Sequence, residues 1–392
     1  MNNKFKLATP PMGWNSYCTC DCDPSEEIML SAADLLIDLG LAEVGYNYVN
    51  LDDGWLKPER DANGRLQHRD DIFPRGMNFL TDYIHSKGLK AGTYLGAGLT
   101  TWHGDAGSLM HEFEDAKSCA EWGFDYIKYD RHPSEDDPCK DTVANYVRMG
   151  LAIKECGRDI IYNLCEHGTT DPWMWAQPVG QLWRTGKDIR DNWKYSENPE
   201  GGLGIIDMID MVVCEAAKYG HKGGFNDPDF LIVGCGKQNE WMGGGCTIEE
   251  YRSVMAIWSM LSAPLLIGAD LRNFAAGKNL DGLEVLKNRG MIAIDQDPLS
   301  IPARRIVHDP LKYDLWFKPM NDFKWAVALV NRSAAAMDIG FTFEEIGLSA
   351  GLPVKLTDAW TGETVARKIK GEYSVNIARH DTAVFIIEPD FN

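Results

Sequence analysis

The sequence predicts an α/β protein: a (β/α)8 barrel over residues 1–300, followed by a small C-terminal antiparallel β-sandwich over residues 301–392. Two observations favour the barrel. Eight strand-like segments alternate with helix-like stretches, and no Gly-rich phosphate loop follows the first segment, as it usually does in an open doubly wound sheet. A third observation marks the second domain: from Ile306 onward, the expected strands are no longer separated by long helices.

The barrel strands are expected where short runs rich in branched and aromatic residues end in polar ones. These runs are residues 12–16, 46–52, 90–96, 124–130, 160–166, 182–188, 224–229 and 264–270. Among the helices between them, the one within residues 23–40 has Asp23, Pro24 and Ser25 as candidate caps and Gly40 as a stop. Another is expected to begin at Thr247, with two glutamates in its first turn.

The sandwich strands are expected where alternating apolar residues are bounded by turn residues. They are residues 314–320, 324–332, 337–343, 353–360, 372–379 and 382–390. The segment 295–305, "DQDPLSIPARR", is the expected link between the two domains.

The charge and the cysteines exclude several classes of function. A formal net charge of -19 repels nucleic acid and anionic membranes, so we expect neither as a partner. Apolar runs are too short to span a bilayer, and the N-terminus shows no secretory signal, which together predict a cytoplasmic protein. Three of the ten cysteines cluster in "CTCDC" (residues 18–22) without a second cluster, so reduced thiols are favoured over a zinc site. The sequence sets no expectation for the oligomeric state.

Lys128 and Asp130 end the fourth expected strand, two residues apart, so both should point into the barrel mouth. A structural ion pair between them is the alternative. The other strand ends add more acidic residues: Asp52, Asp53, Glu166, Asp188, Asp227 and Asp229. Such a mouth, with Lys128 and Arg184 offsetting part of the repulsion, suits a divalent metal or a hydroxyl-rich ligand.

Aromatic residues favour the hydroxyl-rich ligand over the metal. The first strand has no histidine, whereas aromatic residues are frequent near the mouth, although each alone is more often part of a core. They are Trp14, Tyr17, Trp55, Tyr94, Trp102 and Trp183. Two carboxyl groups across such a pocket can cleave a glycosidic bond. The Lys128 ammonium would favour the ionised form of Asp130, a nucleophile, while Asp130 would raise the pKa of Asp188, an acid, against the effect of Arg184.

Eight motifs in order resemble glycoside hydrolase family 27, which includes α-galactosidases and α-N-acetylgalactosaminidases. They are "PPMGWNSY", "YVNLDDGW", "KGLKAGTYLGAG", "DYIKYD", "LCEHG", "LWRTGKDI", "GGFNDPD" and "SAPLLIGADLR", between residue 9 and about residue 300. The resemblance implies a barrel followed by an antiparallel β domain, and no cofactor or metal.

The resemblance also implies roles for individual residues. Asp130 is implied as the nucleophile and Asp188 as the acid/base. Asp52 and Asp53 match the pair that holds the 4- and 6-hydroxyls of galactose, and Lys128 matches a lysine that binds sugar hydroxyls. The remaining implied contacts are Tyr17 in the aromatic wall, Tyr94 in the pocket, Glu166 and Arg184 near the 2-hydroxyl, and Asp229 near the sugar. Alternatively, Glu166 faces away from the pocket and supports Arg184.

Several positions depart from the family pattern. Tyr17 and His167 stand where many members have tryptophan, and Gly96 stands where many have a carboxylate. Trp102 and His132 replace two cysteines that secreted relatives pair. These changes concern the sugar and the leaving group more than the reaction.

We therefore expect a retaining, exo-acting α-galactosidase that acts on oligosaccharides. The alternatives are the same chemistry on another sugar (β-L-arabinopyranosides, α-N-acetylgalactosaminides or α-glucans), a transglycosylase, and a non-catalytic sugar-binding protein. Retention of both Asp130 and Asp188 argues against the last.

Overall fold

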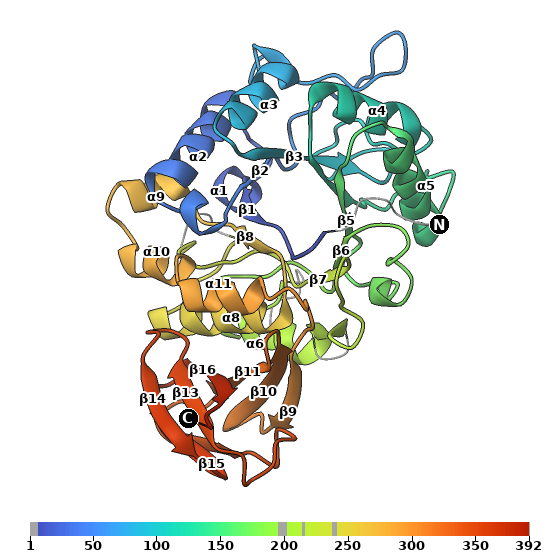
Figure 1. Cartoon of the computed structure of the whole chain (residues 1–392). Helices are drawn as coiled ribbons and strands as arrows, with labels where there is room; N and C mark the ends of the chain where they lie inside the picture. The colour runs from blue at the N-terminus through green and yellow to red at the C-terminus, as the bar shows by residue number, and fades with distance from the viewer. Residues whose placement is uncertain (1–6, 195–201, 214–215, 237–240, 392) are drawn as a thin grey trace.

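Eight parallel strands form a barrel in the computed structural model, which describes residues 7–194, 202–213, 216–236 and 241–391 (Figure 1). The strands are hydrogen-bonded in the order β7-β6-β5-β4-β3-β2-β1-β8. The ring closes just after β7, where Leu231 forms a parallel bridge with Ile267 and its amide donates to the Leu266 carbonyl at 2.8 Å. The predicted barrel is confirmed. Its strands are β1 (Met12–Asn15), β2 (Tyr48–Asn50), β3 (Lys90–Gly96), β4 (Tyr126–Asp130), β5 (Ile161–Cys165), β6 (Leu182–Arg184), β7 (Phe225–Asp227) and β8 (Leu265–Ile267).

Helices lie outside the ring (Figure 1), and two of them begin at caps that the sequence predicts. Ser25 caps α2 by accepting the Ile28 amide at 3.3 Å, and Thr247 caps α8 in a reciprocal pair with Glu250. The main helices are α2 (Glu26–Asp38), α3 (Gly76–Ser86), α4 (Glu112–Trp122), α5 (Thr142–Glu155), α8 (Ile248–Leu261), α9 (Leu271–Ala275), α10 (Leu280–Leu286) and α11 (Arg289–Asp295). Between β5 and β6 every residue is described, and the connection contains only the short 3-10 helix η2 (Pro172–Met174).

The C-terminal domain is an antiparallel sandwich, as predicted. Six strands form one sheet in the order β14-β13-β16-β11-β10-β9, and β12 and β15 form a second. An apolar core that includes Leu329, Phe341, Phe343 and Ile387 lies between them. The strands are β9 (Arg304–His308), β10 (Tyr313–Met320), β11 (Lys324–Asn331), β12 (Met337–Thr342), β13 (Val354–Asp358), β14 (Thr364–Ile369), β15 (Glu372–Ile377) and β16 (Thr382–Pro389).

The sequence prediction missed two of these strands, β9 and β14. Both are the outer strands of the six-stranded sheet, and both carry charged or polar side chains that stay partly or fully exposed. Polar edge strands limit edge-to-edge association, but they lack the apolar alternation that identifies a strand in a sequence.

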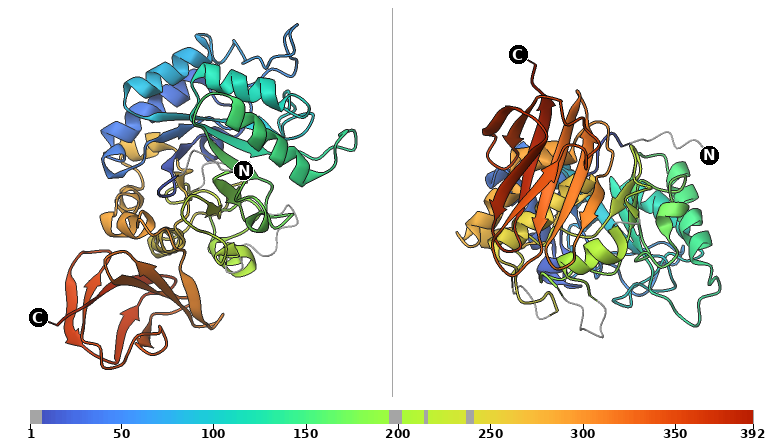
Figure 2. Two further views of the ribbon diagram at one scale, coloured as in Figure 1. Left: turned by 45° about the vertical axis from the view of Figure 1, so that its right-hand side comes forward. Right: turned by 90° about the horizontal axis from the view of Figure 1, so that it is seen from below.

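Helix α8 lies between the barrel and the six-stranded sheet (Figures 1 and 2). Eleven of its fourteen residues are buried, so it has no broad solvent-facing side. Lys318 of β10 donates to the Ser259 carbonyl at 3.1 Å and to Ser262 Oγ at 2.6 Å, across the interface. The predicted division at residue 300 stays a prediction; α11 ends at Asp295 and β9 begins at Arg304.

No helix within the described ranges is long and apolar enough to cross a membrane.

Candidate active site

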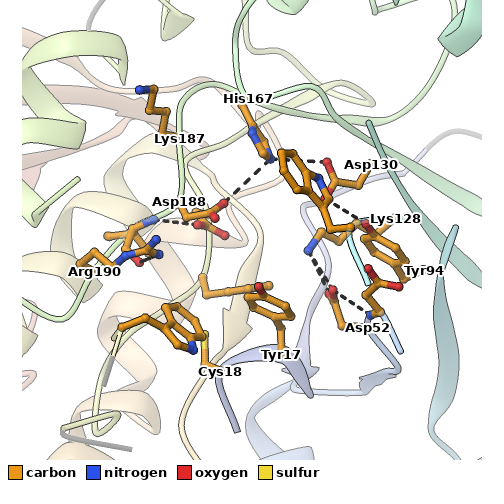
Figure 3. Close-up of a pocket in the computed structure, with 16 residues that line it drawn as sticks. Tyr17, Cys18, Asp52, Tyr94, Lys128, Asp130, His167, Lys187, Asp188 and Arg190 are labelled. Atoms are coloured by element: carbon orange, nitrogen blue, oxygen red, sulfur yellow. Dashed lines mark hydrogen bonds and ion pairs between the residues drawn. The ribbon is translucent and has the colours of Figure 1, made fainter. Parts of the chain in front are cut away.

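A cavity of about 340 Å³ opens at the carboxyl ends of the barrel strands (Figure 3). Eight of the ten predicted site residues line it: Tyr17, Asp52, Asp53, Tyr94, Lys128, Asp130, Asp188 and Asp229. The other two, Glu166 and Arg184, do not. Further lining residues include Trp102, His167, Lys187, Arg190, Phe230 and Trp241.

Strand β4 directs Lys128 and Asp130 into this cavity because alternate side chains of a strand share a face. On the neighbouring strand, Tyr94 lies opposite Lys128 in the register and donates its hydroxyl to Asp130 Oδ2 at 3.2 Å. The other oxygen, Asp130 Oδ1, is buried and accepts no hydrogen bond from the described residues. One oxygen of Asp130 is therefore held in place and the other is available for reaction.

Lys128 forms its ion pair with Asp52, not with Asp130. Its ammonium lies 2.9 Å from Asp52 Oδ2 and 3.2 Å from Oδ1, and Asn15 donates to Oδ2 at 2.8 Å. Burial opposes the charge of Lys128, but the neighbouring acidic groups, Asp52 first, raise its pKa well above the ordinary value. The alternative of a structural Lys128–Asp130 pair is thus wrong. Lys128 stays charged at the floor of the cavity.

Asp53 lies beside this pair, and no cation among the described residues forms an ion pair with it. Its Oδ1 accepts the Gly54 amide at 2.8 Å and its Oδ2 accepts the His103 amide at 3.0 Å. Burial raises the pKa of Asp53 to about 6, because these hydrogen bonds compensate only partly for lost hydration. The carboxyl group is poised to gain from a further donor, such as a sugar hydroxyl.

Asp188 stands at the open side of the cavity, with its side chain 39% exposed. Arg184 donates to Asp188 Oδ1 at 3.0 Å and also pairs with buried Asp229 at 3.0 Å. Burial tends to raise the pKa of Asp188, but nearby cations, with Arg184 first, hold it well below the usual range. The expectation of a raised pKa is wrong for the free site, because Arg184 is bonded directly to Asp188.

His167 lies between Asp130 and Asp188 (Figure 3). Its Nε2 is 3.4 Å from Asp130 Oδ1 and 3.9 Å from Asp188 Oδ1. Because both distances end on one nitrogen, the two Oδ1 atoms lie at most about 7 Å apart, which admits the spacing of about 5–5.5 Å found in retaining glycosidases. His167 adopts a left-handed backbone conformation with φ 59°. It was absent from the predicted site.

The register of β5 explains why His167, and not Glu166, lines the cavity. Asn163 lies opposite Lys128, and Cys165 lies opposite Asp130. Residues opposite one another share a face of the sheet, so the inward positions are 163 and 165, and Glu166 follows in the outward phase. This alternation is visible in the sequence and is the signal that could have corrected the assignment.

Glu166 is tied to the turn that follows it. Its Oε2 accepts from Thr169 Oγ1 at 2.6 Å, from the Thr170 amide at 2.9 Å and from Thr170 Oγ1 at 3.0 Å. Burial raises the pKa of its carboxyl group above the ordinary value, against these hydrogen bonds. The structure places the Glu166 carboxylate away from the cavity, and its hydrogen-bond partners are Thr169 and Thr170 rather than Arg184.

The aromatic residues divide into two groups. Trp14, Trp55 and Trp183 are buried in the core, where their indole N–H groups donate to the Ala269 carbonyl, the Tyr94 carbonyl and Asn226 Oδ1. Tyr17, Tyr94 and Trp102 line the cavity. The second group is suited to contact a ligand.

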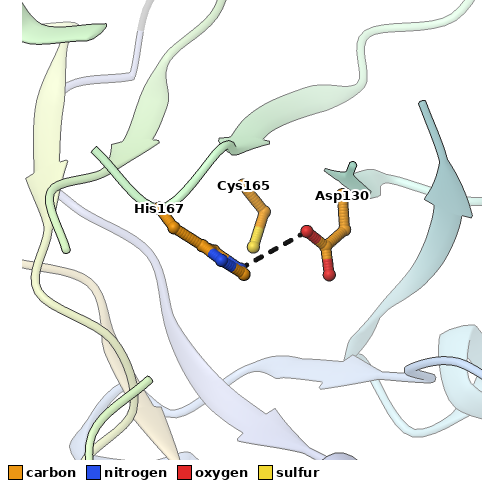
Figure 4. A group of neighbouring side chains, drawn as sticks. All are labelled: Asp130, Cys165 and His167. Carbon is orange, nitrogen blue, oxygen red and sulfur yellow. Dashed lines mark ion pairs between the residues drawn. The ribbon is translucent and has the colours of Figure 1, made fainter. Parts of the chain in front are cut away.

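Two groups of side chains in the described ranges could offer three metal ligands. The first consists of Asp130 and His167, which line the cavity, and the buried Cys165 beside them (Figure 4). Burial raises the pKa of the Cys165 thiol well above its ordinary value, which disfavours the thiolate a metal requires. The second consists of Asp210, His308 and Asp314, and arginines already pair with both of its carboxylates. Neither group contains a residue of the "CTCDC" segment, and none of the nine described cysteines forms a disulfide.

The chain is similar to known proteins over nearly its whole length. A family described as alpha galactosidase A matches residues 9–297, and the alpha galactosidase C-terminal beta sandwich domain matches residues 312–387. Alpha-galactosidase 3 of Arabidopsis thaliana is 38% identical over 99% of this chain and 83% of the relative.

Solved structures agree. Alpha-galactosidase I from Mortierella vinacea superimposes with a TM-score of 0.91 at 30% identity, over 100% of this chain and 99% of that one. The alpha-galactosidase of Saccharomyces cerevisiae, solved with raffinose, gives 0.87 at 25% identity, over 98% of each chain. The predicted resemblance is confirmed, and the chain belongs to the alpha-galactosidase A family, glycoside hydrolase family 27.

Proposed function

We propose that this protein is a retaining α-galactosidase in which Asp130 is the nucleophile and Asp188 the acid/base. The observation that supports it most is the pair of carboxylates that His167 bridges: Asp130 is buried, and its Oδ1 accepts no hydrogen bond from the described residues, whereas Asp188 stands at the open side. The names of the similar proteins, α-galactosidases in sequence and in structure, support the choice of sugar.

The first step forms a covalent galactosyl-enzyme. Asp130 Oδ1 attacks the anomeric carbon while Tyr94 holds Oδ2, and the bond from that carbon to the leaving oxygen breaks. Asp188 transfers its proton to the leaving oxygen. In the second step, Asp188 takes a proton from water, the resulting hydroxide attacks the anomeric carbon, and Asp130 is released. Two inversions leave the anomeric configuration unchanged.

Substrate binding raises the pKa of Asp188, so that this carboxyl group takes up from solvent the proton that the cycle needs. Arg184 keeps the pKa of Asp188 low in the free site, where much of the Asp188 carboxyl group is still hydrated. A sugar over Asp188 removes that water in the presence of the Asp130 charge, and both effects raise the pKa of an acid. Protonation is thereby coupled to occupation of the site.

The floor of the cavity provides the selectivity for galactose. The Asp52–Lys128 pair and Asp53 offer acceptors and a donor to the 4- and 6-hydroxyls. Glucose, with its equatorial 4-hydroxyl, would leave a buried carboxylate unpaired, and arabinopyranose lacks the 6-hydroxyl. We therefore expect α-galactosides to be better substrates than β-L-arabinopyranosides.

Discrimination at the 2-position no longer rests on Glu166, because its carboxylate lies outside the cavity. His167 lines the cavity next to the reacting oxygen of Asp130 instead. An N-acetyl group on the sugar would have to fit against this imidazole, so we expect α-N-acetylgalactosaminides to be poor substrates.

Two measurements test the proposal. Proton NMR of the first-formed sugar should show the α-anomer; initial release of the β-anomer would rule out the covalent intermediate on Asp130. Values of kcat/KM on the nitrophenyl α-galactoside, β-L-arabinopyranoside and α-N-acetylgalactosaminide should fall in that order. A leading arabinopyranoside would contradict the role of Asp53, and a leading N-acetylgalactosaminide would contradict the assignment of the sugar.

A further inference from the structure

Trp102 lies on the rim of the cavity, and no role assigned to the galactosyl site uses it. It lines the cavity and yet is 51% exposed. A tight turn presents it: the Gly104 amide donates to the Thr101 carbonyl at 3.1 Å, and the Thr101 amide donates to the Asp105 carbonyl at 3.0 Å. Gly104 has φ 95°, a conformation that favours glycine. A large apolar ring is thus held in water next to a polar pocket.

Two contacts fix the position of this ring relative to the reacting groups. The residue after it, His103, donates its amide to Asp53 in the floor of the cavity. The indole also packs against the His132 imidazole, with ring centroids 4.5 Å apart and planes at 45°. His132 follows Asp130 by two residues, and its Nδ1 lies 3.3 Å from Thr100 Oγ1. The ring is therefore attached to the loops after both β3 and β4.

This arrangement is suited to a neutral pyranose ring. The C–H face of a pyranose is apolar and packs on an indole, and an exposed tryptophan gains by being covered. The galactosyl unit cannot provide that ring if its hydroxyls reach the buried groups Asp52, Asp53 and Lys128, since these lie at the floor and Trp102 lies at the rim. For Asp188 to protonate it, the leaving oxygen of a galactoside bound with its anomeric carbon at Asp130 must face the open side of the cavity, where Asp188 stands.

We propose that Trp102, supported by His132, is a binding platform for the leaving group, and that this leaving group is a neutral pyranose sugar. The proposal deepens the α-galactosidase function and rests on it. It places a second subsite next to the galactosyl site. The second subsite consists of an aromatic face, whereas the galactosyl site consists of buried charged groups.

Two substrates with the same galactosyl unit separate the subsites. One is α-galactosyl fluoride, whose leaving group has no ring; the other is a disaccharide of galactose α-linked to glucose. Trp102→Ala should lower kcat/KM for the disaccharide about tenfold, the scale of one aromatic stacking contact, and change the fluoride less than about twofold. Trp102→Phe should retain part of the effect. Phe323→Ala, which removes an exposed aromatic side chain from the C-terminal domain, is the matched control.

The other outcomes contradict the proposal in distinguishable ways. Equal losses on both substrates would mean that Trp102 acts on the galactosyl site through the His103–Asp53 bond. No loss on either would mean that the ring has no ligand. In the inactive background Asp130→Asn, calorimetry should show tighter binding of the disaccharide than of galactose, and Trp102→Ala should abolish that difference; an unchanged difference would overturn the platform. A wild-type protein that hydrolyses neither substrate would instead refute the proposed function, and the platform with it.

The support from His132 has its own test. His132→Ala should reduce activity on the disaccharide and not on the fluoride, whereas His132→Phe, which keeps a ring behind the indole, should restore most of it. If His132→Phe did not restore activity on the disaccharide, the support of Trp102 by the His132 ring would be contradicted.

Discussion

Two buried lysines, one at the barrel mouth and one at the domain interface, are bound in opposite ways. Lys128 lies 2.9 Å from a carboxylate oxygen of Asp52, and the neighbouring acidic groups raise its pKa well above the ordinary value. Lys318 is hydrogen-bonded to two neutral acceptors, Ser262 Oγ and the Ser259 carbonyl. Burial lowers the pKa of Lys318 to about 8, although Asp295 opposes that effect.

The difference reflects what each region has to do. At the mouth, a direct ion pair preserves the charge of a group that must still bind a ligand. At the interface, hydrogen bonds satisfy the buried nitrogen, but nothing bonded to it compensates the charge, which therefore costs free energy of folding. Substitutions at the mouth should change activity more than stability, and those at the interface should do the reverse.

The largest effect is expected for Asp130→Asn. Loss of the nucleophile should lower kcat about 10⁴-fold or more, while the melting temperature stays close to that of the wild type. Steady-state kinetics and thermal melts measure the two quantities. Asp71→Asn, in an exposed loop where Asp71 pairs with Arg69, is the control and should change neither by much. If Asp130→Asn unfolded, the barrel mouth would contribute to stability, which would contradict the difference that we infer between the mouth and the interface.

Asp188→Asn should separate substrates by their leaving groups. Without the acid, sugar leaving groups should lose about 10²–10⁴-fold in kcat, whereas dinitrophenol, which departs without protonation, should lose far less. Rates on the disaccharide and on the dinitrophenyl galactoside give the comparison. Equal losses of kcat on the two substrates would show that Asp188 is not the acid.

Asp53→Asn should lower activity and raise stability. The loss of a charged acceptor should reduce kcat/KM by about 10–100-fold. The pKa of Asp53 is about 6 in the folded protein, above its unfolded value, so wild-type stability falls as pH rises from about 4 to 6. The variant lacks this penalty and should have a higher free energy of unfolding at pH 7, by about 1–3 kcal/mol. Denaturant titrations at pH 4 and pH 7 measure it.

The pH dependence of activity provides a second measure at the same residue. Wild-type kcat/KM should rise with pH through about 6 as Asp53 ionises, and the variant should lack that limb. A variant that is less stable at pH 7 would show that Asp53 supports the fold, contrary to the contrast drawn here.

Lys318→Met should leave activity unchanged. The pKa of Lys318 lies below its unfolded value, so the folded state loses the proton first, and wild-type stability gains as pH rises from about 8 to about 10. The variant should lack this gain, which amounts to about 2–3 kcal/mol. Lys324→Met, on neighbouring β11 where Lys324 pairs with Glu388, is the control and should keep the gain. If the free energy of unfolding changed with pH in the same way in the wild type and in Lys318→Met, the charge of Lys318 would have to be compensated in the folded protein.

Sequence reasoning succeeded where one local rule decides the outcome. Period-two alternation sufficed to place Lys128 and Asp130 in one cavity, and the caps at Ser25 and Thr247 followed from residue type. The same alternation, if applied to β5, would have favoured Cys165 and His167 over Glu166.

Other features depend on contacts between distant segments. The partner of Lys128 is Asp52, 76 residues earlier, and the low pKa of Asp188 depends on how Arg184 is oriented. Edge strands β9 and β14 escaped prediction because their solvent-facing composition resembles that of loops. Each of these is set by tertiary packing, which a local pattern does not contain.

The position of α8 makes the two architectural domains a single cooperative unit. One side of this helix packs on the barrel helices α10 and α11, and the other packs on β10, β11 and β16 of the sandwich. A chain that stopped at residue 300 would expose the second side to water. We therefore expect that neither the barrel nor the sandwich folds independently when the chain is divided between them. Heating should melt both in one calorimetric transition.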